Sequence, residues 1–171
     1  MKLSLKKIIE VQSGSVPFSF GLDLSDLSFP QIVNMKAPFA ARGKVRNAAG
    51  ALELAGEMDV DMICICDRCT EPYEVKRNMP VTANLAAELQ DEENPDIFPI
   101  SGDEVDLDEV FTTAFVLSME SKFVCSEDCE GLCPKCGANR SDGDCRCGGE
   151  IDSRLAVLQQ LLDGDEEVTR E

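Results

Sequence analysis

Residues 51–64, ALELAGEMDVDMIC, alternate between two kinds of side chain. Every acidic residue in this stretch occupies an odd-numbered position, whereas the even-numbered positions carry Leu52, Leu54, Met58, Val60 and Met62. Successive side chains of a strand point to opposite faces of its sheet, so a period of two is typical of a strand with one buried face and one solvated face. The stretch therefore predicts a half-buried β-strand.

Two similar runs flank this strand. Residues 73–85 also alternate between apolar and polar side chains, and Pro80 within them indicates a sheet edge or a bulge. Residues 38–46 place Phe39, Ala41 and Val45 on one face and the basic residues Arg42, Lys44 and Arg46 on the other. Together the three runs predict three antiparallel strands.

The basic residues of the first run, Arg42, Lys44 and Arg46, are candidates for nucleic-acid binding. If residues 47–50, NAAG, form the turn into the next strand, Lys44 lies opposite Glu53, and ordinary cross-strand pairing explains the basic stripe. We favour pairing over RNA binding, because the charged face of a sheet is commonly its solvated side.

The second half of the chain predicts loops and helices. Residues 88–105 combine acidic side chains with prolines and predict a long acidic loop. Residues 106–120 have apolar side chains at helical spacing, with Asp106 and Glu109 placed as a capping box. A second amphipathic helix is expected at residues 151–162.

These elements predict an α+β fold: an antiparallel β-sheet with flanking helices and a small cysteine-rich zinc-binding module near the C-terminus. The expected divisions are an α+β domain at 1–121, a zinc module at 122–150, and a helix with an acidic tail at 151–171. The module has few apolar side chains, so hydrophobic burial cannot order it alone. Zinc contributes about 10–16 kcal/mol of apparent binding free energy in such peptides, comparable with a domain's stability of about 5–15 kcal/mol.

Six of the nine cysteines lie between residues 125 and 147, in a chain without histidine. Two residues separate Cys133 from Cys136, so one tight turn can aim both sulfurs at an ion, and a tetrahedral site needs a second pair. Thiolates favour zinc or an iron–sulfur centre, with zinc the default. We expect one structural Zn²⁺ with no open position for catalysis, in preference to a two-zinc cluster in which the six thiolates would have to share sulfurs in strict geometry. The second pair is either Cys145 and Cys147 or Cys125 and Cys129.

Another pair, Cys66 and Cys69, lies between the two best-defined strands. A two-residue turn there would place the two thiols opposite each other. Redox pairs of this spacing normally precede a helix that lowers the thiol pKa, whereas a strand follows here. We therefore rank simple burial first, half of a second metal site second, and a redox pair third.

Composition narrows the class of function. The net charge is −17, and residues 88–110 contain ten acidic residues and no basic one, which suits a basic protein partner better than direct coating of nucleic acid. Without histidine, a phosphate-binding loop or a nucleophile elbow, catalysis has little basis. No membrane span or secretion signal is evident, so we expect a cytoplasmic protein, where clustered cysteines more often bind metal than form disulfides.

Several segments, in order, resemble the bacterial YceD family: LDLSDL, CDRCTEPYE, CEGLCPKCGANR with CRC, and IDSRLAVLQQLL. The most specific are the turn with Cys66, Arg68 and Cys69 and the terminal D-x-R-L-A-x-L, where Ser153 replaces the family's usual proline. Some family members lack the cysteine-rich insertion, which implies that the zinc site is an accessory. The resemblance implies a role in accumulation of large-subunit ribosomal RNA, and family members are often encoded beside a small basic ribosomal protein.

We therefore expect a non-enzymatic factor in large ribosomal subunit biogenesis, with a structural Zn²⁺. Its partner would be a basic ribosomal protein or a large-subunit rRNA precursor. The alternative from another class is a thiol-disulfide redox or metal-relay protein that uses Cys66 and Cys69.

Overall fold

The computed structural model describes residues 1–9, 11, 13–86, 97–143 and 145–147. The chain divides into two compact units, residues 1–129 and residues 130–171. The boundary falls inside the cysteine-rich segment, directly after Cys129. The helix predicted at 151–162 and most of the predicted acidic loop lie outside the described residues.

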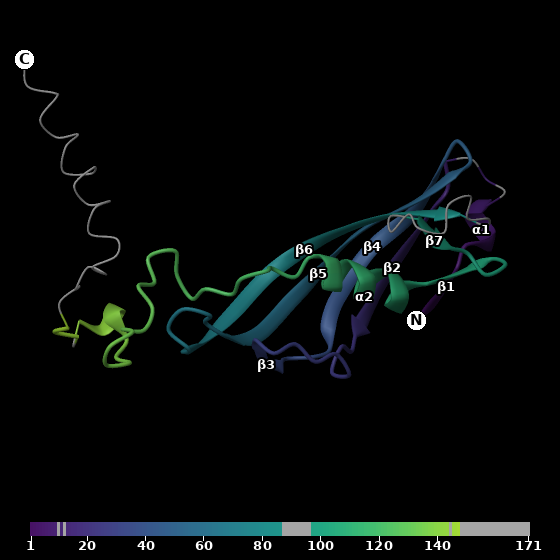
Figure 1. The fold of residues 1–171 in the computed structure, drawn as a ribbon. Helices are drawn as coiled ribbons and strands as arrows, with labels where there is room; N and C mark the ends of the chain where they lie inside the picture. The colour runs from purple at the N-terminus through teal and green to yellow at the C-terminus, as the bar shows by residue number, and fades with distance from the viewer. Residues whose placement is uncertain (10, 12, 87–96, 144, 148–171) are drawn as a thin grey trace, which may run out of the picture. The chain divides into compact units, whose positions relative to one another are not determined.

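A curved, mainly antiparallel sheet forms most of the first unit (Figure 1). Its strand order is β2-β4-β5-β6-β7, and β3 pairs with β5 beyond the end of β4. Among the described strands of this sheet, only the short β7 runs parallel to its neighbour, β6. The strands are β2 (Ser15–Leu22), β3 (Ile32–Met35), β4 (Phe39–Ala48), β5 (Ala51–Ile65), β6 (Pro72–Ala86) and β7 (Ile97–Pro99).

The three strands predicted from the sequence are confirmed as β4, β5 and β6, and their apolar positions are buried along most of their length. On one side of β6, Pro80 pairs with Glu57 of β5 without a break in register. On the other side, β7 pairs only with Asn84–Ala86, so no described strand lies beside Pro80 there. The predicted edge is correct there. Strand β2 was missed, although Val16, Phe18, Phe20 and Leu22 alternate in the same way.

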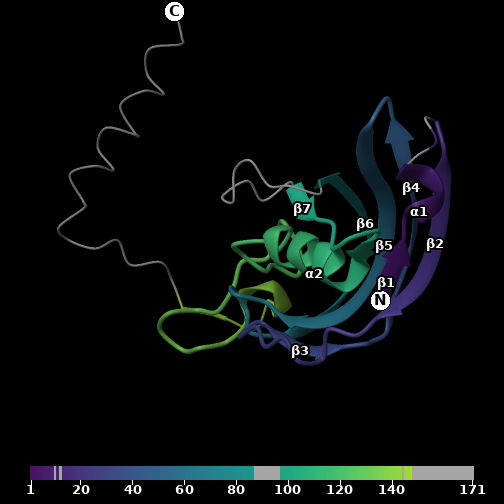
Figure 2. The same ribbon diagram turned by 90° about the vertical axis from the view of Figure 1, so that its right-hand side faces the viewer.

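Helix α2 (Leu107–Leu117) lies on the concave side of the sheet, as Figure 2 shows. The hydrophobic core is formed between the two. The ring of Phe111 packs edge-on against Phe18 and Phe20, with centroids 5.7 and 5.5 Å away, and Phe115 packs against Phe39 at 5.9 Å. The Asp106 half of the predicted capping box is confirmed, because the Asp106 carboxylate caps the helix and accepts from the backbone N–H of Asp108 at 3.1 Å.

The register of the β4–β5 hairpin differs from the prediction. Ala48 pairs with Ala51, which leaves a two-residue turn at Ala49 and Gly50, both with positive φ (54° and 99°). Positive φ at both positions matches the right-handed twist of a hairpin. This shorter turn shifts the pairing by two residues, so Arg46, and not Lys44, lies opposite Glu53.

The remaining elements are short. Strands β1 (Lys2–Ser4) and β8 (Glu104–Asp106) form a separate two-stranded sheet, and helix α1 (Lys6–Ile9) follows β1. The prediction of loop throughout 88–105 is wrong at residues 97–99 and 104–105, which form β7 and the start of β8. Short β pairing depends on partners distant in the sequence, which the local composition of a segment does not show. The second unit contains a single described 3₁₀ turn, η1 (Arg140–Asp142).

Candidate metal centres

The end of the β5–β6 hairpin presents Cys66 and Cys69. The predicted two-residue turn is wrong. The backbone N–H of Cys66 donates to the carbonyl of Glu71 at 2.9 Å, and the N–H of Thr70 donates to the carbonyl of Cys66 at 2.9 Å. Thr70 has a φ of 60°, which lets the chain curl back between these bonds. The loop therefore wraps around the sulfur of Cys66, as a metal knuckle does, and Cys69 is not its strand partner.

The chain after α2 returns to this loop. Asp67 and Phe123 are joined twice: the backbone N–H of Asp67 donates to the Phe123 carbonyl at 2.8 Å, and the N–H of Phe123 donates to the Asp67 carboxylate at 2.7 Å. Phe123 itself is buried against the main core. These contacts bring Cys125 and Cys129 beside the hairpin end.

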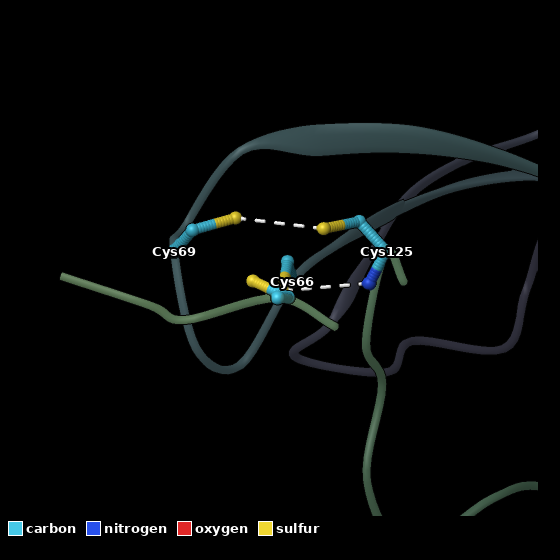
Figure 3. A group of neighbouring side chains, drawn as sticks. Cys66, Cys69 and Cys125 are labelled. Carbon is cyan, nitrogen blue, oxygen red and sulfur yellow. Dashed lines mark hydrogen bonds between the residues drawn. The ribbon is translucent and has the colours of Figure 1, made fainter. Parts of the chain in front are cut away.

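The result is a group of four thiols, the hairpin cluster, comprising Cys66, Cys69, Cys125 and Cys129. Figure 3 shows three of them, with the sulfurs of Cys69 and Cys125 directed toward one another. The Sγ atoms of Cys66 and Cys129 are 3.8 Å apart, those of Cys69 and Cys125 are 3.7 Å apart, and all four lie within 4.8 Å of one another.

These distances suit a tetrahedral ion. Zn–S bonds of about 2.3 Å place the corners of a sulfur tetrahedron about 3.8 Å apart, whereas a disulfide requires about 2.05 Å. All nine cysteines are free thiols. An all-sulfur donor set with these separations fits Zn²⁺, and a filled tetrahedron leaves no position for a reacting water.

The surroundings of Cys66 in the hairpin cluster favour its thiolate form. Burial would raise the pKa of Cys66, but backbone N–H groups of Cys69, Cys125 and Arg68 outweigh it and lower that pKa to about 6. The N–H of Arg68 lies 3.4 Å from this sulfur and that of Cys125 lies 3.5 Å from it. The bond to Cys129 raises the pKa of Cys125 to about 12. Cys66 is thus the thiol that loses its proton most readily without a cation, whereas Cys125 needs a nearby cation to lose its own.

A second group, the knuckle cluster, lies in the second unit and comprises Cys133, Cys136, Cys145 and Cys147. The N–H of Gly137 donates to the carbonyl of Cys133, and the N–H of Cys133 donates to the carbonyl of Ala138, both at 2.8 Å. Gly137 has a φ of 74°, a conformation that glycine adopts without strain. These bonds fold the CPKCG segment into the tight turn that the sequence predicts.

The second pair reaches this knuckle through η1. Asn139 caps that turn, and Gly143, also at φ 74°, ends it shortly before Cys145. The sulfurs of Cys136 and Cys145 are 3.7 Å apart, and all four sulfurs lie within 4.8 Å of one another. Backbone N–H groups of Cys136 and Lys135 lower the pKa of Cys133 to about 6, while the side chain of Cys136 raises the pKa of Cys147 to about 12. The pattern repeats that of the hairpin cluster.

The structure therefore brings Cys133 and Cys136 together with Cys145 and Cys147, one of the two pairs that the sequence left open. The alternative pair, Cys125 and Cys129, lies in the hairpin cluster instead, with Cys66 and Cys69. That second grouping was missed as a set, although eight cysteines arranged in four close pairs are the number that two tetrahedral sites need. The ninth cysteine, Cys64, is buried in β5 with the main core.

The basic stripe of β4 is largely engaged with acidic side chains. Arg42 donates to Glu57 at 2.7 Å and to Asp59 at 3.2 Å, and Arg46 donates to Glu53 at 2.7 Å. Lys44 lies opposite Ala55. Cross-strand pairing thus accounts for two of the three cations, as the sequence analysis favoured, through a register shifted by two residues.

The longest helix in the described ranges is α2, with 11 residues, which is too short to cross a membrane.

Comparisons with known proteins identify relatives of this chain and a family that matches it. The chain is similar to a protein of Mycobacterium bovis and to two of Mycobacterium tuberculosis, all described as uncharacterized, with 24% identity over 131 residues. The alignment covers 74% of this chain and 63% of each relative, so it spans less than two thirds of those proteins. No solved structure matches. Residues 54–162, a range that contains both clusters, match the family described as large ribosomal RNA subunit accumulation protein YceD, and the chain belongs to this family.

Proposed function

We propose that the protein is a non-enzymatic factor in biogenesis of the large ribosomal subunit, required for accumulation of its rRNA and held in shape by two structural zinc ions. The family match across residues 54–162 carries the proposal. It covers most of the curved sheet's longest hairpin and both clusters, so both candidate metal sites lie within the matched region.

Two structural ions are favoured over the single ion expected from the sequence. Each cluster offers four sulfurs at distances that fit one tetrahedron, and no cysteine belongs to both clusters. Neither site needs a shared sulfur, and neither leaves an open position for chemistry. The role of the metal is then to order the chain, which agrees with a factor that binds and does not catalyse.

A basic ribosomal protein is the partner that the charge distribution favours over an rRNA precursor. The net charge of −17 attracts cationic surfaces, and the cations Arg42 and Arg46 already pair with acids on β5. Phosphate binding needs local positive charge, which this paired strand supplies poorly. We expect the protein to act in the cytoplasm, where newly made basic ribosomal proteins present cationic surfaces of this kind.

The alternative, redox or metal-relay chemistry at Cys66 and Cys69, has one observation in its favour, the lowered pKa of Cys66. Burial opposes it, because the two residues are only 0% and 2% exposed. A reactive thiol must be reached by its substrate. Reversible oxidation of this pair in zinc-loaded protein would support the alternative.

The test replaces the chromosomal copy with the variant Cys66→Ser, C66S, and uses C64A as the matched control. Cys64 is equally buried and only two residues away, but it lies outside the cluster. We expect C66S to lower the ratio of large- to small-subunit rRNA and C64A to preserve it. Affinity capture at low salt should recover a basic ribosomal protein with the C64A variant. An unchanged rRNA ratio in cells that lack the protein altogether would refute the proposal.

A further inference from the structure

The two residues inside the Cys66–Cys69 turn, Asp67 and Arg68, contact the opposite half of the hairpin cluster. One nitrogen of the Arg68 guanidinium, Nη1, donates to the Cys129 carbonyl at 2.8 Å and to the Glu127 carbonyl at 3.1 Å. The backbone N–H of the same residue points at the Cys66 sulfur, 3.4 Å away. Arg68 therefore connects both halves of the cluster, which lie about sixty residues apart in the sequence.

Asp67 holds the other end of the returning segment. Its backbone N–H and its carboxylate both bond to the backbone of Phe123, which anchors the chain two residues before Cys125. Asp67 thus holds the segment just before Cys125, and Arg68 holds the segment that contains Cys129. The N–H of Cys129 also donates to the Ser126 carbonyl at 3.1 Å, which closes the turn between the two ligands.

We propose that Asp67 and Arg68 are positioning residues that assemble the hairpin cluster before a metal ion binds. The proposal rests on the metal sites of the proposed function. All the contacts above are made by the protein alone, so the returning segment is ordered by hydrogen bonds as well as by any ion. A site whose ligands are already oriented binds its metal more tightly, because less conformational freedom is lost on binding.

Arginine suits this position for a geometric reason. Its planar, permanently charged head offers several N–H donors in fixed directions, whereas a lysine ammonium is a compact point donor. Carbonyls on a tight turn point in different directions, and a guanidinium can reach two of them together. The positive charge also lies near a centre that carries net negative charge once four thiolates surround Zn²⁺.

The experiment uses the full chain and ¹¹³Cd²⁺ as the probe, because each four-thiolate site gives its own NMR signal. C136S removes the signal of the knuckle cluster and so assigns both. Chelator competition then measures the affinity of each cluster separately. We expect R68A to weaken cadmium binding at the hairpin cluster by roughly 10- to 100-fold and to shift its signal, with the knuckle cluster unchanged. R68K should lose less, since one donor can be kept.

Matched variants separate positioning from general damage. Glu127→Ala leaves the accepting carbonyl in place, so E127A should bind cadmium as the unmodified protein does. Asp67→Asn keeps an oxygen for the Phe123 N–H, so D67N should bind nearly normally, whereas D67A should lose affinity. If R68A does not fold, the comparisons of R68K with E127A and of D67A with D67N decide the question by the same criteria.

Normal hairpin-cluster affinity in both R68A and D67A would overturn the proposal, as would equal losses at both clusters. A protein that shows no cadmium signal at either cluster would refute the metal sites themselves. If cells that lack the protein keep an unchanged ratio of large- to small-subunit rRNA while the purified protein gives normal cadmium signals, the ribosomal role is refuted. The proposal for Asp67 and Arg68 is then unaffected.

Discussion

The hairpin cluster and the knuckle cluster each contain four cysteines whose sulfurs lie within 4.8 Å of one another, but their surroundings differ. In the hairpin cluster, Cys66, Cys69 and Cys129 are buried and pack with Tyr73 and Val124 at the end of two fifteen-residue strands. In the knuckle cluster only Cys133 is buried, and it is the only buried hydrophobic side chain among the described residues after 129. One set of thiols is positioned by a folded sheet, and the other has little apart from short turns to hold it.

The two clusters therefore differ in whether the hydrophobic core or a bound metal ion supplies most of the stabilising free energy. Burial of apolar side chains supplies most of the free energy of folding, and a segment without it needs another source. We therefore expect the first unit to remain folded without metal and the described part of the second unit to depend on it.

The largest expected effect follows removal of zinc with a chelator. Loss of about 10–16 kcal/mol of apparent binding free energy should unfold the described part of the second unit. Hydrogen exchange should then become fast at the N–H groups of Gly137 and Arg140, which donate to carbonyls within that unit. The paired amides of β5 serve as the control and should stay protected. Persistent protection of the Gly137 N–H in metal-free protein would contradict the expectation that the described part of the second unit depends on metal.

The next effect tests the other side of the comparison. Phe111 is fully buried between the sheet and α2, so Phe111→Ala should lower the free energy of unfolding of the first unit by about 3–5 kcal/mol. Urea denaturation measures this change. Val116→Ala on the same helix removes a side chain that is 42% exposed and should cost at most about 0.5 kcal/mol. Equal losses for the two variants would show that α2 does not cover the core.

Acidification should weaken zinc binding at both clusters. Cys125 and Cys147, with pKa values raised to about 12, hold protons at neutral pH that zinc must displace. Bound zinc favours the deprotonated form, so affinity rises with pH and falls on acidification, by about tenfold per pH unit for each proton released. Competition with a chelator from pH 8 to pH 6 measures the slope. Because the two clusters share one pattern of pKa shifts, clearly unequal slopes would separate them chemically.

The smallest effect concerns the solvated face of the sheet. Arg46→Ala removes an exposed ion pair with Glu53 and should lower the stability of the first unit by about 0.2–1 kcal/mol. Lys44→Ala, at the neighbouring position opposite Ala55, should have no measurable effect. Neither variant should change zinc content, which plasma emission spectrometry reports. A larger loss of stability for Lys44→Ala than for Arg46→Ala would contradict the observed register and favour the predicted one, in which Lys44 lies opposite Glu53.

Much of the fold could be predicted because its signals are local. The alternation in residues 51–64 and the cap at Asp106 depend on neighbours within a few positions, and both predictions are confirmed. The hairpin register was wrong because it depends on whether the turn contains two residues or four, and the NAAG segment permits both. Strand β2 was missed, although its alternation was present and Pro17 did not prevent pairing with β4.

The candidate metal centres divide in the same way. The spacing of CPKCG and of CRC determines by itself that these thiols can converge, since a few residues of chain can bring them together. Nothing local joins Cys66 to Cys129, 63 positions away. That partnership exists because the two longest strands carry the hairpin end away from the sheet centre, while α2 and the segment after it return the chain to the same point. The sequence determines which thiols are available as ligands, and long-range packing of the sheet and helix decides which four lie together.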